Sequence, residues 1–437
     1  MVKENRVPGS RLTFVIHAVL LAAIFPSCAT AQANTPTIDQ LVEQIRQLQQ
    51  EDQALRERLK ALEDKQNLPS TPSSADRPPQ LLANEPPSPP APSPAAGDFH
   101  DLRGIQWRGF GELDYKALDQ RQPELATYGF NPGSAGNFYT GDFDLFLRSR
   151  LSEKLNVLGD LTFEETNDQH FTVDLRQAFL EYRANDHFKL LFGRYQTAVG
   201  YYNQVFRSAS WLQTTADRPL IMEYASNGGL LPTQAVGVSL AGSLPSGSLD
   251  LHYIAEYGSS NTVRPDIDGS GLLNYEDDGN HVLLGLFVRP SRLSGFQAGG
   301  SWFHDKISNN SAGTTGSRYG QTLVNAYLVY NGHGFELLNE GFLLRHAELH
   351  GPELFNMPAF YVQASRRFGH FRPFVRYQYV NTNPESVFND VLLRYGPSFG
   401  ARYDFNTFVA FKAQLDRTVR KNEPDLNGLH LQVAFTF

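Results

Sequence analysis

The sequence predicts an all-β fold: an antiparallel transmembrane β-barrel of about sixteen strands, preceded by a short N-terminal α-helical coiled coil. Three observations indicate the barrel. After residue 99, runs of about ten residues alternate apolar and polar side chains, the breaks between them are short and long in turn, and the chain ends on the alternating stretch GLHLQVAFTF. Lipid offers no hydrogen bonds to the backbone, so strands that cross it must close into a ring.

Residues 1–33 are typical of a secretory signal peptide. Lys3, Arg6 and Arg11 precede a short apolar core, and small residues around Ala31 supply a cleavage site. The alternative is a lipoprotein acylated at Cys28, the only cysteine. If the signal is removed, the remaining chain has no cysteine, which excludes disulfides and cysteine metal clusters.

The charge argues against a nucleic-acid partner. The whole chain carries a formal charge of −8, and removing three basic and one acidic residue with the signal changes it to −10. A protein that binds nucleic acid is expected to show the opposite balance.

Residues 34–66 contain a heptad repeat, which predicts a coiled coil. One seam holds Ile38, Ile45, Asp52 and Leu59, and the other holds Leu41, Leu48, Leu55 and Leu62. An amphipathic helix lying on its own barrel is the alternative.

Residues 67–98 form a spacer between this segment and the barrel. Ten of the 26 prolines lie between Pro69 and Pro94, so we expect an extended chain without a core of its own. The barrel domain then spans residues 99–437.

The alternation places sixteen strands, an even number. We expect them at 105–117, 138–151, 154–166, 171–184, 187–196, 234–243, 248–258, 280–290, 294–306, 318–330, 333–346, 358–368, 371–380, 391–404, 407–420 and 428–437. Within 171–184 the apolar phase changes near Gln177.

Loop length follows strand parity. Breaks after even-numbered strands are short, whereas those after odd-numbered strands are mostly long, at 118–137, 197–233, 259–279, 307–317, 347–357 and 381–390. The break at 167–170 is the short exception. This asymmetry is typical of outer-membrane barrels, and the 31 Phe and 19 Tyr residues can supply aromatic girdles at both interfaces.

Two stretches carry a resemblance to Gram-negative porins. The terminal strand with Phe437 resembles the signal that barrel-assembly machinery reads, and Phe188–Asn203 is similar to a strand-to-loop segment of the phosphate-selective porins O and P. In that family a proline is expected where Ala198, Val199 and Gly200 stand. The resemblance implies an outer-membrane, homo-oligomeric (trimeric) porin with its coiled coil in the periplasm.

In porins the third external loop folds inward and narrows the channel, and here the third loop is 197–233. Its candidate constriction residues are Tyr201, Tyr202, Arg207, Arg218 and Glu223. The alternative is a flap that stays outside the lumen.

Charged residues in the inward phase predict a pore wall with two signs. The acids are Glu112, Asp114, Asp142, Asp144 and Asp160, and the arginines are Arg367, Arg372, Arg376, Arg394 and Arg402. We expect these sets on opposite walls, where they would create a transverse field that sorts solutes by charge. The alternative is a lumen of mutually satisfied ion pairs.

Three short motifs suggest other chemistry. Asp266, Asp268, Ser270 and Asp277 fit part of a calcium loop, with an acidic loop that binds no ion as the alternative. Ser398 lies in a G-x-S-x-G stretch but inside a predicted strand, which argues against a nucleophile elbow. His346 and His350 bring two imidazoles and a carboxylate together at an external loop, where a solvated surface is the simpler interpretation and a metal site the alternative.

The predicted function is passive diffusion of small hydrophilic solutes, with an anion or phosphate preference from the arginines. We expect no catalytic residue, no nucleic-acid partner and no cofactor beyond a possible structural calcium. The alternatives are a structural protein that links the outer membrane to the cell wall through its coiled coil, residues 38–62, and an outer-membrane barrel enzyme.

Overall fold

The computed structural model of the chain covers the predicted barrel with several gaps. It describes residues 100–102, 104–119, 136–165, 171–222, 230–260, 264–265, 272–273, 280–308, 318–383 and 392–437. Outside these residues lie the predicted signal peptide, coiled coil and spacer (1–98), Glu223, and the calcium candidates Asp266, Asp268, Ser270 and Asp277. These features stay predictions.

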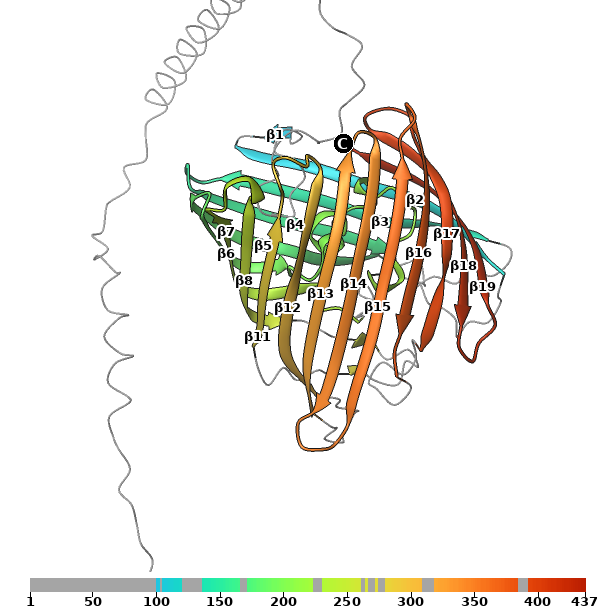
Figure 1. Cartoon of the computed structure of the whole chain (residues 1–437). Helices are drawn as coiled ribbons and strands as arrows, with labels where there is room; N and C mark the ends of the chain where they lie inside the picture. Colours follow the sequence, from blue (N-terminus) through green and yellow to red (C-terminus); the bar gives the residue numbers. More distant parts are fainter. Residues whose placement is uncertain are drawn as a thin grey trace, which may run out of the picture. The chain divides into compact units, whose positions relative to one another are not determined.

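Sixteen antiparallel strands of the described residues form a closed barrel (Figure 1). They are β2 (Ile105–Leu118), β3 (Asn137–Arg150), β4 (Leu155–Glu165), β5 (Phe171–Asn185), β6 (Phe188–Gln196), β7 (Gln234–Leu244), β8 (Leu251–Ser260), β11 (His281–Val288), β12 (Phe296–Ser308), β13 (Arg318–Gly332), β14 (Phe335–Glu348), β15 (Leu354–Arg366), β16 (Phe371–Asn381), β17 (Leu393–Asp404), β18 (Val409–Arg420) and β19 (Leu426–Thr436). Each pairs with the next, and β19 pairs with β2, so the ring has no free edge.

The remaining elements are short. They are β1 (His100–Leu102), which pairs with β2, the β9 (Arg264–Pro265) and β10 (Leu272–Leu273) ribbon, α2 (Tyr201–Val205), and the 3₁₀ turns η2 (Ser210–Leu212) and η3 (Gly247–Leu249). Among the described residues, no helix combines the length and the apolar character needed to cross a membrane.

The predicted number of strands is confirmed, but one predicted loop is wrong. We expected a long connection at 347–357, whereas β14 continues to Glu348 and β15 begins at Leu354. The reason is that the ladder extends further than the alternation suggested, with Ala347 opposite Leu354. His346, the last residue of the predicted strand 333–346, therefore lies two residues before the end of β14.

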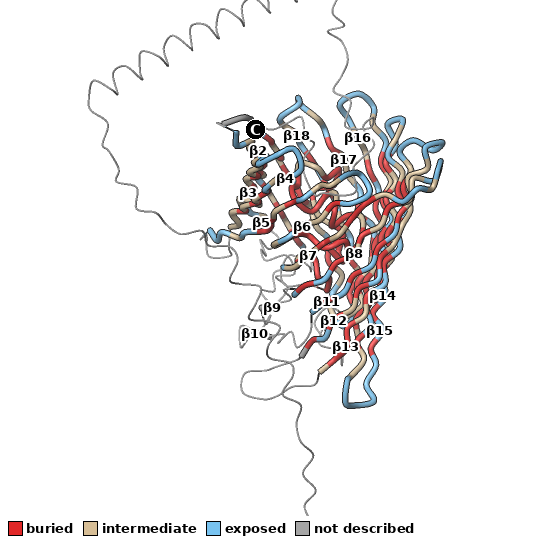
Figure 2. The backbone as a smooth tube through the Cα atoms, turned by 90° about the vertical axis from the view of Figure 1, so that its left-hand side faces the viewer, coloured by how far each residue is buried: buried red, intermediate tan, exposed pale blue. Residues whose placement is uncertain are grey.

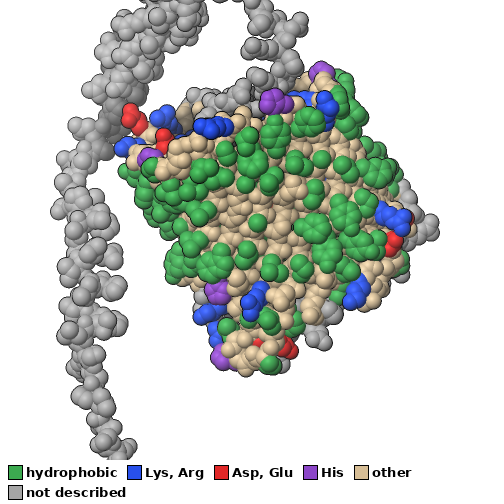
Figure 3. All heavy atoms as spheres, viewed as in Figure 1, with side chains coloured by type: hydrophobic (Ala, Val, Ile, Leu, Met, Phe, Trp, Pro, Cys, Tyr) green, Lys and Arg blue, Asp and Glu red, His purple; other side chains and the backbone are tan. Residues whose placement is uncertain are grey.

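The wall is polar inside and apolar outside. Along β13, Gln321 and Asn325 face inward and are 1% and 2% exposed, whereas Val324 and Leu328 face outward and are 46% and 41% exposed. Figure 2 shows buried and exposed residues alternating along the strands, and Figure 3 shows hydrophobic side chains across the outer face of β11 to β15. A barrel with this outer surface suits hydrocarbon surroundings, so the strands are transmembrane.

The C-terminal residue covers the seam where the barrel closes. Gly109 and Phe437 exchange two backbone hydrogen bonds, of 2.9 Å and 3.0 Å. The Phe437 ring lies over Gly109, with ring centroids 5.8 Å from Trp107 and 5.5 Å from Phe143. A Cβ atom at Gly109 would lie 2.2 Å from this ring, so glycine is needed for the close approach.

We therefore expect Gly109→Ala to destabilise the barrel. The Phe437 ring would have to leave its place over β2, and overpacking of this kind costs about 1 to 3 kcal/mol. The measurement is the temperature at which the folded band disappears on SDS gels. Gly159→Ala on β4 is the matched control, because its Cβ would meet no atom within 4 Å. Equal melting of the two variants would contradict the role given to Phe437.

Candidate functional site: the lumen and the segment inside it

Residues 197–222, the described start of the predicted constriction loop, lie inside the barrel; we call them the lumenal segment. Its hydrogen-bond and ion-pair partners come from all around the ring: Lys116 (β2), Asp142 (β3), Glu256 (β8), Glu340 (β14), Gln378 (β16), Arg402 (β17), Gln414 (β18) and His430 (β19). A single segment can reach all these strands only from within a closed ring.

Two stretches of the lumenal segment are held by apolar packing. They contribute Ala198, Val199, Tyr202, Phe206, Leu220, Ile221 and Met222 to a core shared with inward residues of β7 to β16. The rings of Tyr202 and Tyr361 lie 6.1 Å apart, and those of Tyr201 and Tyr327 lie 5.6 Å apart. Burying each large side chain contributes about 1.5 to 3 kcal/mol, so this packing holds the segment on that side of the lumen.

Glu340 binds the first turn of α2. Its carboxylate oxygens accept the backbone N–H groups of Tyr201 (2.8 Å) and Tyr202 (2.7 Å) and the hydroxyl of Tyr361 (2.5 Å). Gly200 precedes the helix with φ of 79°, and a Cβ there would lie 2.6 Å from a carboxylate oxygen of Glu340. The glycine thus permits both the turn and the close approach.

The middle of the lumenal segment, residues 210–217, which we call the strap, lies on a row of cations. The row, which we call the basic wall, consists of Arg372, Arg376, Arg402 and Lys412 on β16 to β18. Lys412 Nζ donates to the carbonyls of Ser210 (2.5 Å) and Thr215 (3.1 Å), Arg402 Nη1 to those of Trp211 (2.6 Å) and Gln213 (2.8 Å), and Arg376 Nη1 to that of Asp217 (2.9 Å). The side chains of the basic wall therefore bind the backbone carbonyl oxygens of the strap.

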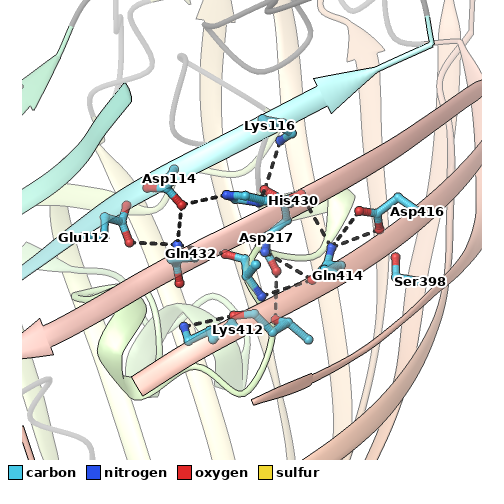
Figure 4. Close-up of polar contacts among 12 residues, drawn as sticks. Glu112, Asp114, Lys116, Asp217, Ser398, Lys412, Gln414, Asp416, His430 and Gln432 are labelled. Carbon is cyan, nitrogen blue, oxygen red and sulfur yellow. Dashed lines mark hydrogen bonds and ion pairs between the residues drawn. The ribbon is translucent and has the colours of Figure 1, made fainter. Parts of the chain in front are cut away.

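Asp217 attaches the end of the strap to β2, β18 and β19 (Figure 4). Its Oδ1 lies 3.0 Å from Lys116 Nζ and 2.9 Å from His430 Nδ1, and its backbone N–H donates to Gln414 Oε1 at 3.2 Å. The Nε2 of His430 lies 2.6 Å from Asp114 Oδ1. One imidazole thus links a carboxylate of the barrel to a carboxylate of the strap.

The pKa of Asp217 determines when this attachment is ionised. Burial alone would raise the pKa, but His430 and Lys116 outweigh burial and hold the pKa well below its ordinary value. The pKa of an aspartate in an unfolded chain is about 3.9. The contribution of ionised Asp217 to folding stability is therefore fully present above that pH and is lost only as the pH falls through the lower pKa of the folded state. The attachment therefore persists at neutral and mildly acidic pH.

Arg176 is the main counter-ion of the acidic residues on the inner face of β3 and β4. Its guanidinium lies 2.7 Å from Asp142 Oδ2 and 3.1 Å from Asp144 Oδ1, and it also pairs with Glu164. The side chains of Arg176 and Asp144 are 3% and 1% exposed. This part of the lumen is therefore a compact ion-pair network.

A β-bulge in β5 turns Arg176 inward. Asp160 lies opposite Gln177 and Leu161 lies opposite Leu175, which leaves Arg176 as the extra residue. Both Arg176 and Gln177 are buried on the lumen side. The predicted change of phase near Gln177 is confirmed, and the bulge is its cause.

The predicted constriction residues fall in different surroundings. Tyr201 and Tyr202 lie in the apolar part described above, whereas Arg218 Nη2 lies 3.0 Å from Asp142 Oδ2. Burial, together with Arg176 and Arg218, lowers the pKa of Arg207 to about 9. Arg207 therefore keeps its charge at neutral pH.

We expected the acidic and basic sets on opposite walls of the lumen. This prediction is wrong. Closure places β19 alone between β18 and β2, so the strands that carry the acids and those that carry the basic wall are near neighbours in the ring. Four of the five predicted arginines pair locally with a carboxylate. Arg367 and Arg402 contact Asp404 at 2.8 Å and 2.7 Å, Arg372 contacts Glu336 at 3.5 Å, and Arg394 contacts Glu423 at 3.5 Å. Any field therefore acts between adjacent parts of the wall, with Asp217 near their junction.

The remaining motifs form no catalytic or metal site in the part of the chain that the structure describes. Ser398 faces inward in the middle of β17 and accepts a hydrogen bond from Gln378 Nε2 (3.3 Å), without the strand-to-helix turn of a nucleophile elbow. His346 is buried on β14, with Nε2 2.8 Å from Gln321 Oε1. No group of three or more described His, Cys, Asp or Glu side chains is arranged to hold a metal ion.

Sequence reasoning missed several residues that hold the lumenal segment. Lys412 and Gln414 lie in the inward phase of the predicted strand 407–420, and Glu340 lies in that of 333–346, so the alternation could have found them. Asp217 carries no such signal, because its partners Lys116 and His430 come from the two ends of the barrel sequence.

No protein-family model matches the sequence, and no curated protein matches it significantly. Solved structures do match. The outer membrane channel DcaP of Acinetobacter baumannii has a TM-score of 0.56 at 9% identity over 78% of this chain and 99% of that chain. The anion-selective porin from Comamonas acidovorans gives 0.55 at 11% identity over 76% and 99%, and OmpF of Salmonella typhi gives 0.50 at 13% over 76% and 97%. The chain therefore has the sixteen-stranded barrel fold of outer-membrane porins.

Proposed function

We propose that this protein is a passive diffusion channel of the bacterial outer membrane for small hydrophilic solutes, with a preference for anions such as phosphate. One observation carries the proposal: a closed barrel with an apolar outer face encloses a polar lumen that the lumenal segment narrows. The likeness in fold to outer-membrane porins supports it.

The mechanism is selection by size and charge, without a covalent step. The basic wall supplies guanidinium groups, which bind carboxylate and phosphate oxygens in a bidentate manner. The acids of β2 to β4 are partly neutralised by Arg176 and Arg218, which reduces their attraction for cations. Fixed charges beside a narrow path thus favour anions over cations.

We also propose the assembly and location that the porin resemblance implies. The protein is a homo-oligomer, with a trimer as the expected form, and residues 34–66 extend into the periplasm. Barrel-assembly machinery reads the strand that ends at Phe437, and Asp266, Asp268, Ser270 and Asp277 are the residues to test for calcium.

The test is single-channel conductance in a planar bilayer across a KCl gradient. We expect an ohmic conductance whose reversal potential indicates anion preference, and Arg376→Gln with Lys412→Gln is expected to lower that preference. Arg417→Gln is the matched control, because this arginine is 61% exposed and faces away from the lumen. Folded protein without conductance would refute the channel, and cation preference would refute the proposed selectivity.

A further inference from the structure

The basic wall binds the strap through uncharged oxygens. Arg372 and Arg402 also pair with Glu336 and Asp404, at 3.5 Å and 2.7 Å. Among the described residues, neither Arg376 nor Lys412 has a carboxylate within 4.0 Å; they donate instead to strap carbonyls and to the Thr215 hydroxyl. The charge of these two cations is therefore solvated by backbone dipoles rather than neutralised.

The wall also holds donors that the strap does not use. The Nε atoms of Arg372 and Arg376 are buried without a hydrogen-bond partner in the structure, and Arg376 is 1% exposed. An oxyanion presents several acceptor oxygens and a negative charge. Its hydrogen bonds to guanidinium or ammonium join two opposite charges and can be bidentate, whereas a backbone carbonyl offers only a dipole to the same donors. A phosphate or carboxylate group therefore has the advantage over the strap for the same donors.

The strap differs from the chain on either side of it. Ala209, which precedes it, packs with Phe110 and Phe146, and Leu220, which follows it, belongs to the apolar core. Between these two anchors, Trp211 and Leu212 are partly buried against the same Phe110 and Phe146 cluster. Attachment of residues 213–217 rests mainly on polar contacts with the basic wall, Gln414, Lys116 and His430. A competitor for these contacts can release the strap while both ends stay fixed.

We propose that the strap is an internal pseudo-ligand of the basic wall, and that oxyanionic solutes carrying carboxylate or phosphate groups bind to this wall by displacing it. Arg376 and Lys412 are the central residues of the oxyanion site. Displacement widens the path along β16 to β18 as the solute binds. This inference rests on the proposed channel function and adds to it a defined binding site and a gate operated by the solute.

Tryptophan fluorescence gives a direct readout of displacement. The chain has three tryptophans, and Trp211 lies in the strap with the Arg402 guanidinium 4.9 Å from its ring. In a Trp107→Phe, Trp302→Phe background, we expect inorganic phosphate at constant ionic strength to change the Trp211 emission saturably, whereas KCl alone leaves it unchanged. The double substitution Arg376→Gln and Lys412→Gln should raise the half-saturating phosphate concentration at least tenfold. Arg394 pairs with Glu423 outside the strap contacts, so Arg394→Gln should leave the half-saturating phosphate concentration unchanged.

A cleavable crosslink between the strap and β18 tests whether the effect of phosphate on conductance requires the strap to move. The backbone N–H of Ala216 lies 3.1 Å from Gln414 Oε1, so Ala216→Cys and Gln414→Cys can be joined by a short, cleavable thiol crosslinker in a Cys28→Ser background. We expect phosphate to raise KCl conductance in the untethered channel, the tether to abolish this rise, and cleavage to restore it.

The outcomes distinguish the two proposals. Conductance in KCl with no effect of phosphate on emission or current would overturn the displacement of the strap while leaving the channel intact. Current blocked by phosphate with unchanged Trp211 emission would place the anion beside a fixed strap, which also overturns displacement. Folded protein that conducts in no condition would overturn the channel itself.

Discussion

Replacing Arg176 with glutamine is expected to lower the free energy of unfolding of the barrel by about 3 to 5 kcal/mol, the usual cost of removing one partner of a buried ion pair. The substitution leaves Asp144, which is 1% exposed, without its cation, and it removes the charge that faces Asp142 and Glu164. Denaturant unfolding in detergent micelles, followed by tryptophan fluorescence, measures the change. A fall in the yield of folded protein should accompany it.

Two further variants test the cause. Arg183→Gln lies on the same strand, but Arg183 is 39% exposed and pairs with Glu181 at 3.3 Å, so we expect a loss below about 1 kcal/mol. Adding Asp144→Asn to Arg176→Gln should restore part of the stability, because it removes the unpaired charge. If Arg176→Gln and Arg183→Gln cost the same, Arg176 is not the central counter-ion of this network.

Replacing Glu340 with alanine is expected to detach the start of the lumenal segment. The substitution should change the single-channel current more than the stability of the barrel. The backbone N–H groups of Tyr201 and Tyr202 and the hydroxyl of Tyr361 lose their common acceptor. Each buried donor left unsatisfied costs about 1 to 3 kcal/mol. We expect larger and noisier single-channel currents, with the folded band on SDS gels retained because the strand ladder does not depend on this side chain.

The controls for Glu340 use its own position and its neighbour. Glu340→Gln keeps one carbonyl acceptor and should give currents between those of the wild type and the alanine variant. Asn339→Ala, on the outer face of β14, should leave the currents unchanged. Currents from Glu340→Ala that match the wild type would show that apolar packing alone holds the segment.

Much of the fold could be predicted from the sequence, because the signals are local. Alternation along β13 determines which of Gln321 and Val324 faces the lumen, and the sequence shows the change of phase near Gln177, for which the structure supplies the cause, a bulge. The same alternation identified Arg376 and Arg402 as inward residues. It misplaced the connection near His346, because pairing with a neighbouring strand extended the ladder beyond the alternating pattern.

The sequence by itself determined the number of strands and the face on which each side chain lies, since a period of two residues is set within each strand. Only the tertiary structure decided which charges meet. Closure of β19 on β2 brings His430 to Asp114 across 316 residues of chain, and folding of the lumenal segment brings Asp217 to the same imidazole. These contacts depend on ring closure and on the path of one loop, neither of which is encoded in the periodicity of a single strand.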